Sequence, residues 1–132
     1  MSHPTITAAS AAPIGRDRVS LYGDAVGDHN PVHFDVDFAK AAGLPDTVVH
    51  GPFTATIVLD LLIAQLGPDA VLNLDLRLRG PVFPGDALTI SPADYGVDVY
   101  NQAGVLIASG VTMLEGDEML ERDEMLEGDE NL

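Results

Sequence analysis

The chain has 132 residues, which is enough for one domain with a hydrophobic core and too few for two domains of ordinary size. Apolar residues make up 46% of the chain and favour a packed globule, while the lack of cysteine excludes a disulfide framework and thiolate metal sites. The formal net charge of −15 argues against nucleic acid as a partner.

The first residues, MSHPTITAAS, have neither a basic region nor a long apolar region, so we expect no secretory signal. The longest apolar run, TATIVLDLLIAQL, is 13 residues long and contains Asp60. A segment of that length is too short to cross a bilayer. The sequence therefore predicts a cytoplasmic protein that needs no membrane partner.

Three helices are predicted in the first half of the chain. Residues 16–27 place apolar side chains at roughly helical spacing and end at Gly27. Residues 37–44 form a shorter candidate that stops at a glycine. In residues 50–68, Pro52 suits the first helical turn and a Gly-Pro pair supplies the stop. This third segment is apolar on nearly all sides, which predicts a buried helix.

Strands are predicted after residue 68. In residues 72–79, four leucines alternate with polar residues, the pattern of a strand with one buried and one solvated face. Further strands are expected at 87–90, 97–100 and 105–114, with the last two forming a hairpin. An apolar helix followed by antiparallel strands predicts an α+β domain whose sheet wraps around that helix.

Residues 113–130 consist of three copies of a six-residue unit, MLEGDE, MLERDE and MLEGDE. They hold nine acidic residues and one arginine, which leaves 12 acidic and five basic residues in the preceding part. A period of six matches neither a helix nor a strand. We therefore divide the chain into a single domain, 1–112, and an acidic low-complexity tail, 113–132, which is either a solvated natural tail or an artificial extension.

The stretch GDHNPVHFD, residues 27–35, concentrates ionisable side chains and has three interpretations. A metal site would use His29, His33 and Asp35, but Pro31 disfavours the helix that would bring the two histidines onto one face. An ordinary surface turn would also explain the aspartate, asparagine and proline. The third interpretation is the working part of an enzyme.

A second element, VVHGPF, contains His50, which lies 17 residues after His33. A His-Gly-Pro sequence that opens a buried helix leaves free backbone N–H groups where the helix dipole favours an anion. Gly51 has no side chain that would keep a ligand oxygen away. His50 and Gly51 would equally suit a simple helix cap, but that interpretation does not account for both elements together.

The segment from Tyr22 to Gly51, with its Asp-x-Asn-Pro-x-His run and its later His-Gly, resembles the MaoC-like, (R)-specific enoyl-CoA hydratase family. The later RLRGPVFPGDAL also resembles that family's strand, turn and strand. The resemblance implies a hot-dog fold, in which an antiparallel sheet wraps around a long central helix.

The resemblance also implies roles for individual residues. Asp28 and His33 fall on the family's catalytic pair, which holds the water that adds to an enoyl thioester. The N–H of Gly51 falls on the donor to the thioester oxygen. Supporting positions are Asn30, Pro31 and His50. The substrate carrier would be coenzyme A or acyl carrier protein, and the resemblance implies no metal and no other cofactor.

Some features depart from the family pattern or have more than one interpretation. Thr54 is a candidate contact to the thioester, and Arg77 and Arg79 either meet the phosphates of coenzyme A or form a solvated strand face. Residues 85–112 are few for three strands, so one strand is expected to be shortened. Three phenylalanines near the motifs line either the acyl pocket or the core; these are Phe34, Phe38 and Phe53.

The function expected from the sequence is the reversible hydration of a trans-2-enoyl thioester to an (R)-3-hydroxyacyl thioester, which makes the protein a hydro-lyase. Two alternatives stay open, a non-catalytic thioester-binding subunit of a heteromeric hydratase and a thioesterase on the same fold. Because hot-dog domains of this kind pair, a homodimer or higher oligomer is expected.

Overall fold

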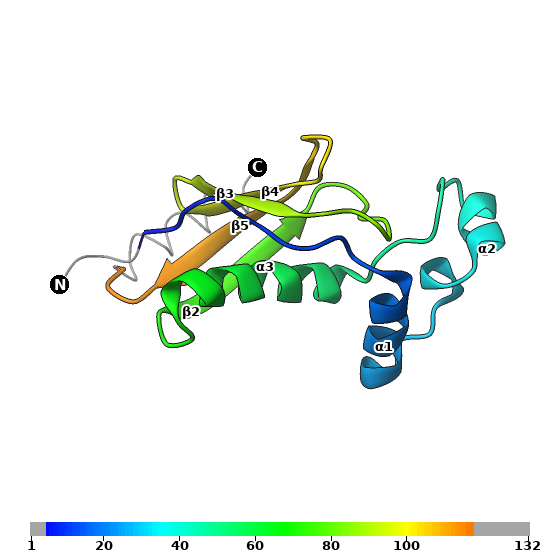
Figure 1. Cartoon of the computed structure of the whole chain (residues 1–132), viewed down its shortest axis with the longest axis horizontal. Coiled ribbons are helices and arrows are strands. Elements are labelled where there is room, and N and C mark those ends of the chain that lie inside the picture. Colours follow the sequence, from blue (N-terminus) through cyan, green and yellow to red (C-terminus); the bar gives the residue numbers. More distant parts are fainter. Residues whose placement is uncertain (1–4, 118–132) are drawn as a thin grey trace, which may run out of the picture.

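The computed structural model describes residues 5–117 as one sheet with a long helix on one of its faces and two shorter helices beyond one end (Figure 1). The sheet contains five strands in the spatial order β1-β3-β4-β5-β2, and each neighbouring pair is antiparallel. The α+β class predicted from the sequence is therefore confirmed. The strands are β1 (Ala9–Ser10), β2 (Val71–Leu78), β3 (Thr89–Ala93), β4 (Gly96–Tyr100) and β5 (Leu106–Leu114).

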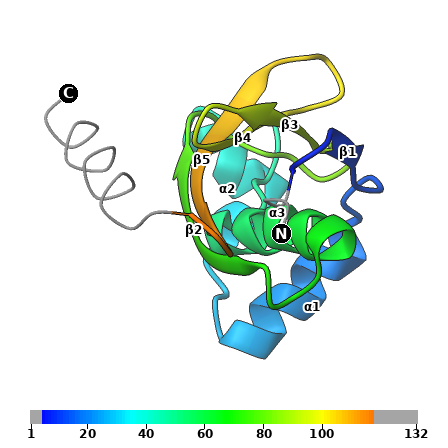
Figure 2. The ribbon, with the colours of Figure 1, turned by 90° about the vertical axis from the view of Figure 1, so that its left-hand side faces the viewer.

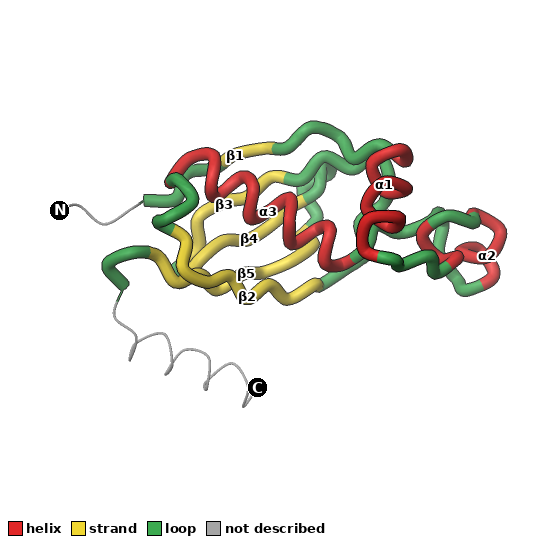
Figure 3. Tube along the Cα trace, turned by 90° about the horizontal axis from the view of Figure 1, so that it is seen from below, coloured by secondary structure: helices red, strands yellow, loops and turns green. Residues whose placement is uncertain are grey.

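The helices are α1 (Arg16–Val26), α2 (Val36–Ala41) and α3 (Gly51–Leu66), with a short 3-10 turn, η1 (Pro31–His33), between the first two. The sheet curves around α3, which lies along its inner face (Figures 2 and 3). By contrast, α1 and α2 extend beyond one end of the sheet (Figure 1). The turn that carries the candidate catalytic residues is thus placed beside the first turn of α3.

The core lies between α3 and the inner face of the sheet. Val58 and Leu62 of α3 are fully buried against residues from three strands and their connections. Burying one side chain of this size stabilises a fold by about 1.5–3 kcal/mol. The fully buried residues of the sheet side are Leu88, Ile90, Val97, Val99 and Ala108.

The predicted helix boundaries hold closely because they depend on local chemistry. Gly27 adopts φ +74° immediately after α1, and Gly67 adopts φ +87° immediately after α3. Side chains disfavour that region of the backbone, so glycine ends both helices at low cost. The helix expected at 37–44 begins one residue earlier, behind the capping side chain of Asp35, and ends at Ala41.

All the strands predicted after residue 68 are present, and the sheet contains one further strand that was not expected. Strand β1 is two residues long and joins the sheet through β3, far away in sequence. The last three strands are all present, although β3 and β4 have five residues each. Strand β5 continues through Leu114, two residues past the predicted domain boundary at 112. Most of the acidic tail, residues 118–132, lies outside the described residues.

The expectation that all four leucines of β2 share a buried face is wrong at both ends of the strand. Leu74 and Leu76 are half-buried, whereas Leu72 and Leu78 are 60% and 50% exposed. A bulge between Val71 and Asn73 turns Leu72 outward. In addition, β2 is an edge strand, so it has a neighbouring strand, β5, on one side only and its ends are less covered.

Helix α3 is buried along one face and open along the other, because the single chain covers it from the sheet side. Asp60 lies on the open face and is exposed, so its carboxylate avoids the cost of burial in the core. Among the residues that the structure describes, no helix is long and apolar enough to span a membrane.

Candidate active site

The turn after α1 is held by its own backbone and side chains. The N–H of Asp28 donates to the carbonyl of Gly23 in α1, 3.0 Å away. This hydrogen bond ties the start of the turn to the end of the helix. The side chain of Asn30 accepts from the N–H of Val32 at 3.1 Å and so caps the 3-10 turn, in which Pro31 is the first residue. Asn30 and Pro31, the predicted supporting residues, thus both lie in this turn.

His33 is fixed in one tautomer by its surroundings. Its Nδ1 lies 2.7 Å from the carbonyl oxygen of Val48. A carbonyl oxygen can only accept, so Nδ1 carries the hydrogen and Nε2 keeps the lone pair of the neutral ring. Val48 is itself held because its N–H donates to the carbonyl of Val32, 3.1 Å away. His33 therefore presents a hydrogen-bond acceptor on its free side.

Asp28 faces that acceptor. The Oδ2 atom of Asp28 lies 3.9 Å from Nε2 of His33, and the side chains are 48% and 12% exposed respectively. This distance is too long for a direct hydrogen bond and leaves room for one water that donates to both atoms. The structure therefore brings together the two residues that the sequence predicted as a pair.

His50 joins this pair, with contacts that sequence reasoning missed. Its ring stacks on the ring of His33 with centroids 3.8 Å apart, and its Nε2 lies 3.2 Å from the backbone oxygen of Asp28. His50 is 1% exposed. Because 22 residues separate it from Asp28, no local pattern in the sequence could reveal the hydrogen bond.

Gly51 begins α3 directly after His50. None of the described residues accepts a hydrogen bond from its backbone N–H, and the dipole of α3 adds partial positive charge at this end. A Cβ atom built on Gly51 would lie 2.9 Å from Cδ1 of Leu78, so the helix start packs closely against the end of β2. The position suits a donor to a ligand oxygen.

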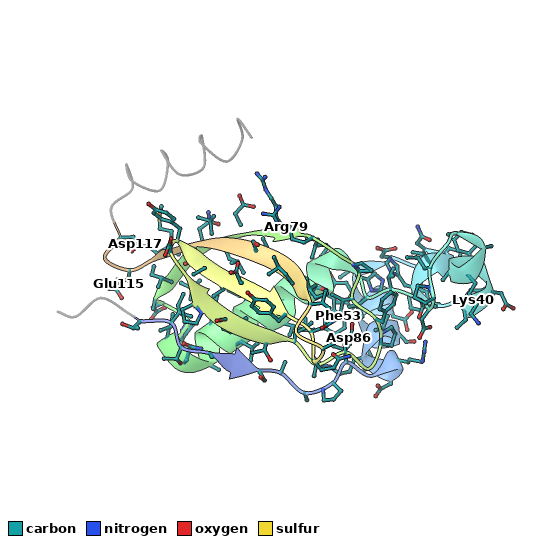
Figure 4. All side chains as sticks on the ribbon, turned by 90° about the horizontal axis from the view of Figure 1, so that it is seen from above. Lys40, Phe53, Arg79, Asp86, Glu115 and Asp117 are labelled. Carbon is teal, nitrogen blue, oxygen red and sulfur yellow. The ribbon has the colours of Figure 1, made fainter. Side chains whose placement is uncertain are left out.

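The other predicted contacts lie elsewhere. The hydroxyl of Thr54 is buried and donates to the backbone oxygen of His50 at 3.3 Å, which directs it into the helix. Arg77 and Arg79 line a hollow of about 290 Å³ whose other walls come from β2, β3, β4, β5 and the turn between β3 and β4. Figure 4 shows Arg79 over the sheet and apart from Phe53 in the first turn of α3. The structure does not bring these arginines to the Asp28 turn.

A small pocket of about 100 Å³ opens beside His33. Its walls come from α1, from the turn and from the loop after β2. Of the three phenylalanines near the motifs, Phe34 lines this pocket, Phe38 is 47% exposed and Phe53 is buried in the core. The lining residues are Arg16, Val19, Ser20, His33, Phe34 and Pro84.

The metal site considered from the sequence does not form. His29 binds Asp24 instead, with Nε2 and Oδ1 2.9 Å apart, and the side chain of Asp35 caps α2. A different group of ligand atoms, from Asp28, His33 and His50, does gather within 4.8 Å. However, imidazole binds a metal in the plane of its ring, and these two rings stack at 26°. Their lone pairs therefore do not converge on one ion.

An ion pair fixes the segment that leads to Val48. Nη2 of Arg16 lies 2.7 Å from Oδ2 of Asp46, and Nη1 of Arg16 donates to the hydroxyl of Thr47 at 3.1 Å. The hydrogen bond from Arg16 lowers the pKa of Asp46, and the N–H of Thr47 adds to this effect. The first turn of α1 is thus connected to the strand-like segment whose carbonyl orients His33.

Replacing Asp46 with asparagine is expected to lower the free energy of unfolding at pH 7 by up to about 1 kcal/mol, as is usual for surface ion pairs. Because folding lowers the pKa of Asp46, its stabilisation is fully present above the unfolded value near 3.8. It is lost as the pH falls through the lower, folded value. Urea unfolding of both proteins at several pH values should show the difference shrink below pH 3.8, and a constant difference would contradict the assignment.

Gly23 lies buried on α1, directly behind the turn. A Cβ atom there would approach Cζ of Phe34 to 2.6 Å and the backbone oxygen of Asp28 to 2.8 Å. Gly23→Ala is therefore expected to destabilise the protein by about 1–3 kcal/mol, the usual cost of overpacking. Thermal unfolding measures the change. Gly80→Ala is the matched control, since nothing lies within 4 Å of its Cβ position, and equal stability of the two variants would contradict the prediction.

Known proteins resemble this chain in sequence over part of their length. Enoyl-CoA hydratase ChsH3 of Mycobacterium tuberculosis is 37% identical over 84 residues, which cover 61% of this chain and 29% of that protein. The 3-hydroxyacyl-thioester dehydratase X of the same organism is 38% identical over 84 residues, with coverages of 62% and 29%. The chain therefore spans less than a third of the length of these two relatives.

Solved structures share the fold. The unliganded R-hydratase PhaJ1 from Pseudomonas aeruginosa superposes with a TM-score of 0.71 at 23% identity, covering 87% of this chain and 83% of that one. The (R)-hydratase from A. caviae involved in PHA biosynthesis gives a TM-score of 0.69 at 25% identity, with coverages of 85% and 94%. The predicted hot-dog fold is thereby confirmed. Residues 3–112 match the model of the MaoC like domain, and the chain belongs to the MaoC-like dehydratase family.

Proposed function

We propose that this domain catalyses the reversible hydration of a trans-2-enoyl thioester to an (R)-3-hydroxyacyl thioester. The observation that carries the proposal is the fixed tautomer of His33, whose Nε2 acceptor faces the carboxylate of Asp28 across 3.9 Å. A water between the two atoms has its protons directed at both acceptors and its oxygen lone pairs directed outward. General acid–base catalysis of this kind contributes about 10²- to 10⁴-fold.

In the proposed reaction, Nε2 of His33 takes a proton from the water while the hydroxide adds to C3 of the double bond. Electron density moves through C2 to the thioester oxygen, where negative charge develops. The N–H of Gly51, at the positive end of α3, donates to that oxygen. The cluster of Asp28 and His33 then returns a proton to C2, so one molecule of water is added in total. Coenzyme A or acyl carrier protein is the proposed carrier.

Mixing crotonyl-CoA with the purified chain tests the proposal. Absorbance of the conjugated enoyl thioester should fall, and chiral separation of the product should yield the (R)-3-hydroxy isomer. Binding without hydration would instead support a thioester-binding subunit of a heteromeric enzyme. Release of free thiol would support a thioesterase. Formation of the (S) isomer would contradict the proposed stereochemistry.

We also propose that a second copy covers the open side of α3 and the edge strand β2. A largely apolar groove of about 280 Å³ runs between these two elements, and exposed Leu72 lies at its edge. The backbone of an edge strand has unpaired N–H and C=O groups, which suit an antiparallel copy of the same strand. The residues that line the groove are Ala55, Thr56, Leu59, Val71, Leu72, Asn73 and Leu74.

Leu72→Lys is accordingly expected to shift the chain from dimer to monomer, because it places a charge on an exposed residue that lines the groove of the proposed contact. Sedimentation equilibrium over a range of concentrations measures the change. Val105→Lys is the control, since Val105 is also exposed, at 54%, but lies away from the groove. An unchanged mass for Leu72→Lys would contradict this interface.

A further inference from the structure

His50 is enclosed on several sides by aromatic rings. The rings of Tyr22, Phe34 and His33 lie 5.0, 5.7 and 3.8 Å from it, measured between centroids. A phenylalanine at this position would satisfy the same packing. The packing by itself therefore does not explain why the position holds a polar side chain.

The hydrogen bonding of His50 gives the explanation. Its Nε2 lies 3.2 Å from the backbone oxygen of Asp28, and a carbonyl accepts but does not donate, so Nε2 carries the hydrogen. The Nδ1 atom then holds a lone pair, and it is buried without a hydrogen-bond partner among the described residues. A buried unsatisfied acceptor costs about 1–3 kcal/mol. The histidine thus carries an energetic penalty that phenylalanine would avoid.

Asp28 needs this contact because its side chain has little support of its own. The carboxylate is 48% exposed, and the N–H of Asn30 is 3.3 Å from its Oδ1. Its position relative to His33 therefore depends on the backbone of Asp28. That backbone is held at its N–H by Gly23 and at its carbonyl by His50.

We infer that His50 is a positioning residue, which fixes the Asp28 carboxylate opposite Nε2 of His33. It does so through one side chain that donates to the Asp28 backbone and stacks on the His33 ring. The predicted effect of His50 on kcat rests on the proposed function. The positioning of Asp28 by His50 does not depend on it. This positioning requires hydrogen on Nε2 of His50, the atom that faces the backbone oxygen of Asp28.

Two variants separate the parts of this role. His50→Phe keeps an aromatic ring but removes the donor to Asp28 and the unpaired lone pair. We expect its stability to be equal to or above that of the wild type, while kcat for crotonyl-CoA falls by about 10- to 100-fold, the cost of misplacing a catalytic group by about 1 Å. His50→Gln keeps a donor and should lose less kcat. In both, KM should change little, because no substrate contact is removed.

Val58→Ala serves as the control for a merely structural role, since Val58 is fully buried on α3 and touches neither part of the pair. It should lower the unfolding temperature and leave kcat unchanged. Wild-type kcat in His50→Phe, or a loss of kcat in proportion to a loss of stability, would overturn the inference.

A nuclear magnetic resonance measurement tests the structural content independently of activity. Long-range proton–nitrogen spectra of the ring nitrogens should show hydrogen on Nε2 of His50 and on Nδ1 of His33. The amide resonance of Asn30, which reports on the turn, should shift in His50→Phe and stay near its wild-type position in His50→Gln. Hydrogen on Nδ1 of His50 would overturn the inference. Failure of the wild type to hydrate crotonyl-CoA, with these spectra as expected, would contradict only the proposed function.

Discussion

His33→Ala is expected to lower kcat for enoyl-thioester hydration by about 10²- to 10⁴-fold, the usual contribution of general acid–base catalysis. The variant loses the Nε2 acceptor that takes the proton from water, while the Gly51 N–H and the rest of the turn remain. KM should change less than kcat, because the ring acts mainly in the transition state. Steady-state kinetics with crotonyl-CoA measure both constants.

The control for this variant is His29→Ala, four residues earlier in the same turn. His29 is exposed and pairs with Asp24, so its loss removes a histidine without changing the acceptor at the site. We expect wild-type kcat for His29→Ala. Equal losses in the two variants would show that the turn is only structurally disturbed and would contradict the role of His33.

Asp28→Asn is expected to reduce kcat by a similar factor, about 10²- to 10⁴-fold. The substitution keeps the shape of the side chain and its acceptor for the N–H of Asn30, but it removes the negative charge and the second acceptor oxygen. Thermal unfolding should show little change. The kinetic assay therefore measures a chemical loss at nearly constant structure.

Asp24→Asn is the matched control, because Asp24 is an exposed aspartate near the same turn whose partner is His29. It should keep wild-type kcat. Full activity of Asp28→Asn would contradict the catalytic role of Asp28. His33 and Gly51 would then remain as the candidate catalytic groups.

The parts of the fold that follow from local chemistry could be predicted from the sequence. Gly27 and Gly67 mark the ends of α1 and α3, and the proline and asparagine between Asp28 and His33 predict a turn, which the structure forms as a 3-10 turn. The pairing of β4 with β5 was also expected, since a short turn joins them. Asp28 and His33 lie close together because both belong to this one turn.

Contacts between distant segments could not be predicted in the same way. Strand β2 pairs with β5, 28 positions beyond its end, and β1 pairs with β3, so both partners are set by the packing of the whole sheet. The bulge that exposes Leu72 breaks the alternation that the sequence suggested. The bond from His50 to Asp28 likewise depends on how α3 enters the core.

The sheet order has a consequence for synthesis of the chain. Strands β3, β4 and β5 form a meander of short-range contacts, but β2 has no partner until residues 106–114 have been made. Helix α3 lies against the inner face of that sheet, and it contains the longest apolar run of the chain. Non-local pairing slows folding, and exposed apolar segments aggregate. A nascent chain that has reached residue 88 thus carries this apolar helix before β3, β4 and β5 have been made, and a chaperone that binds such segments should associate with it at that stage.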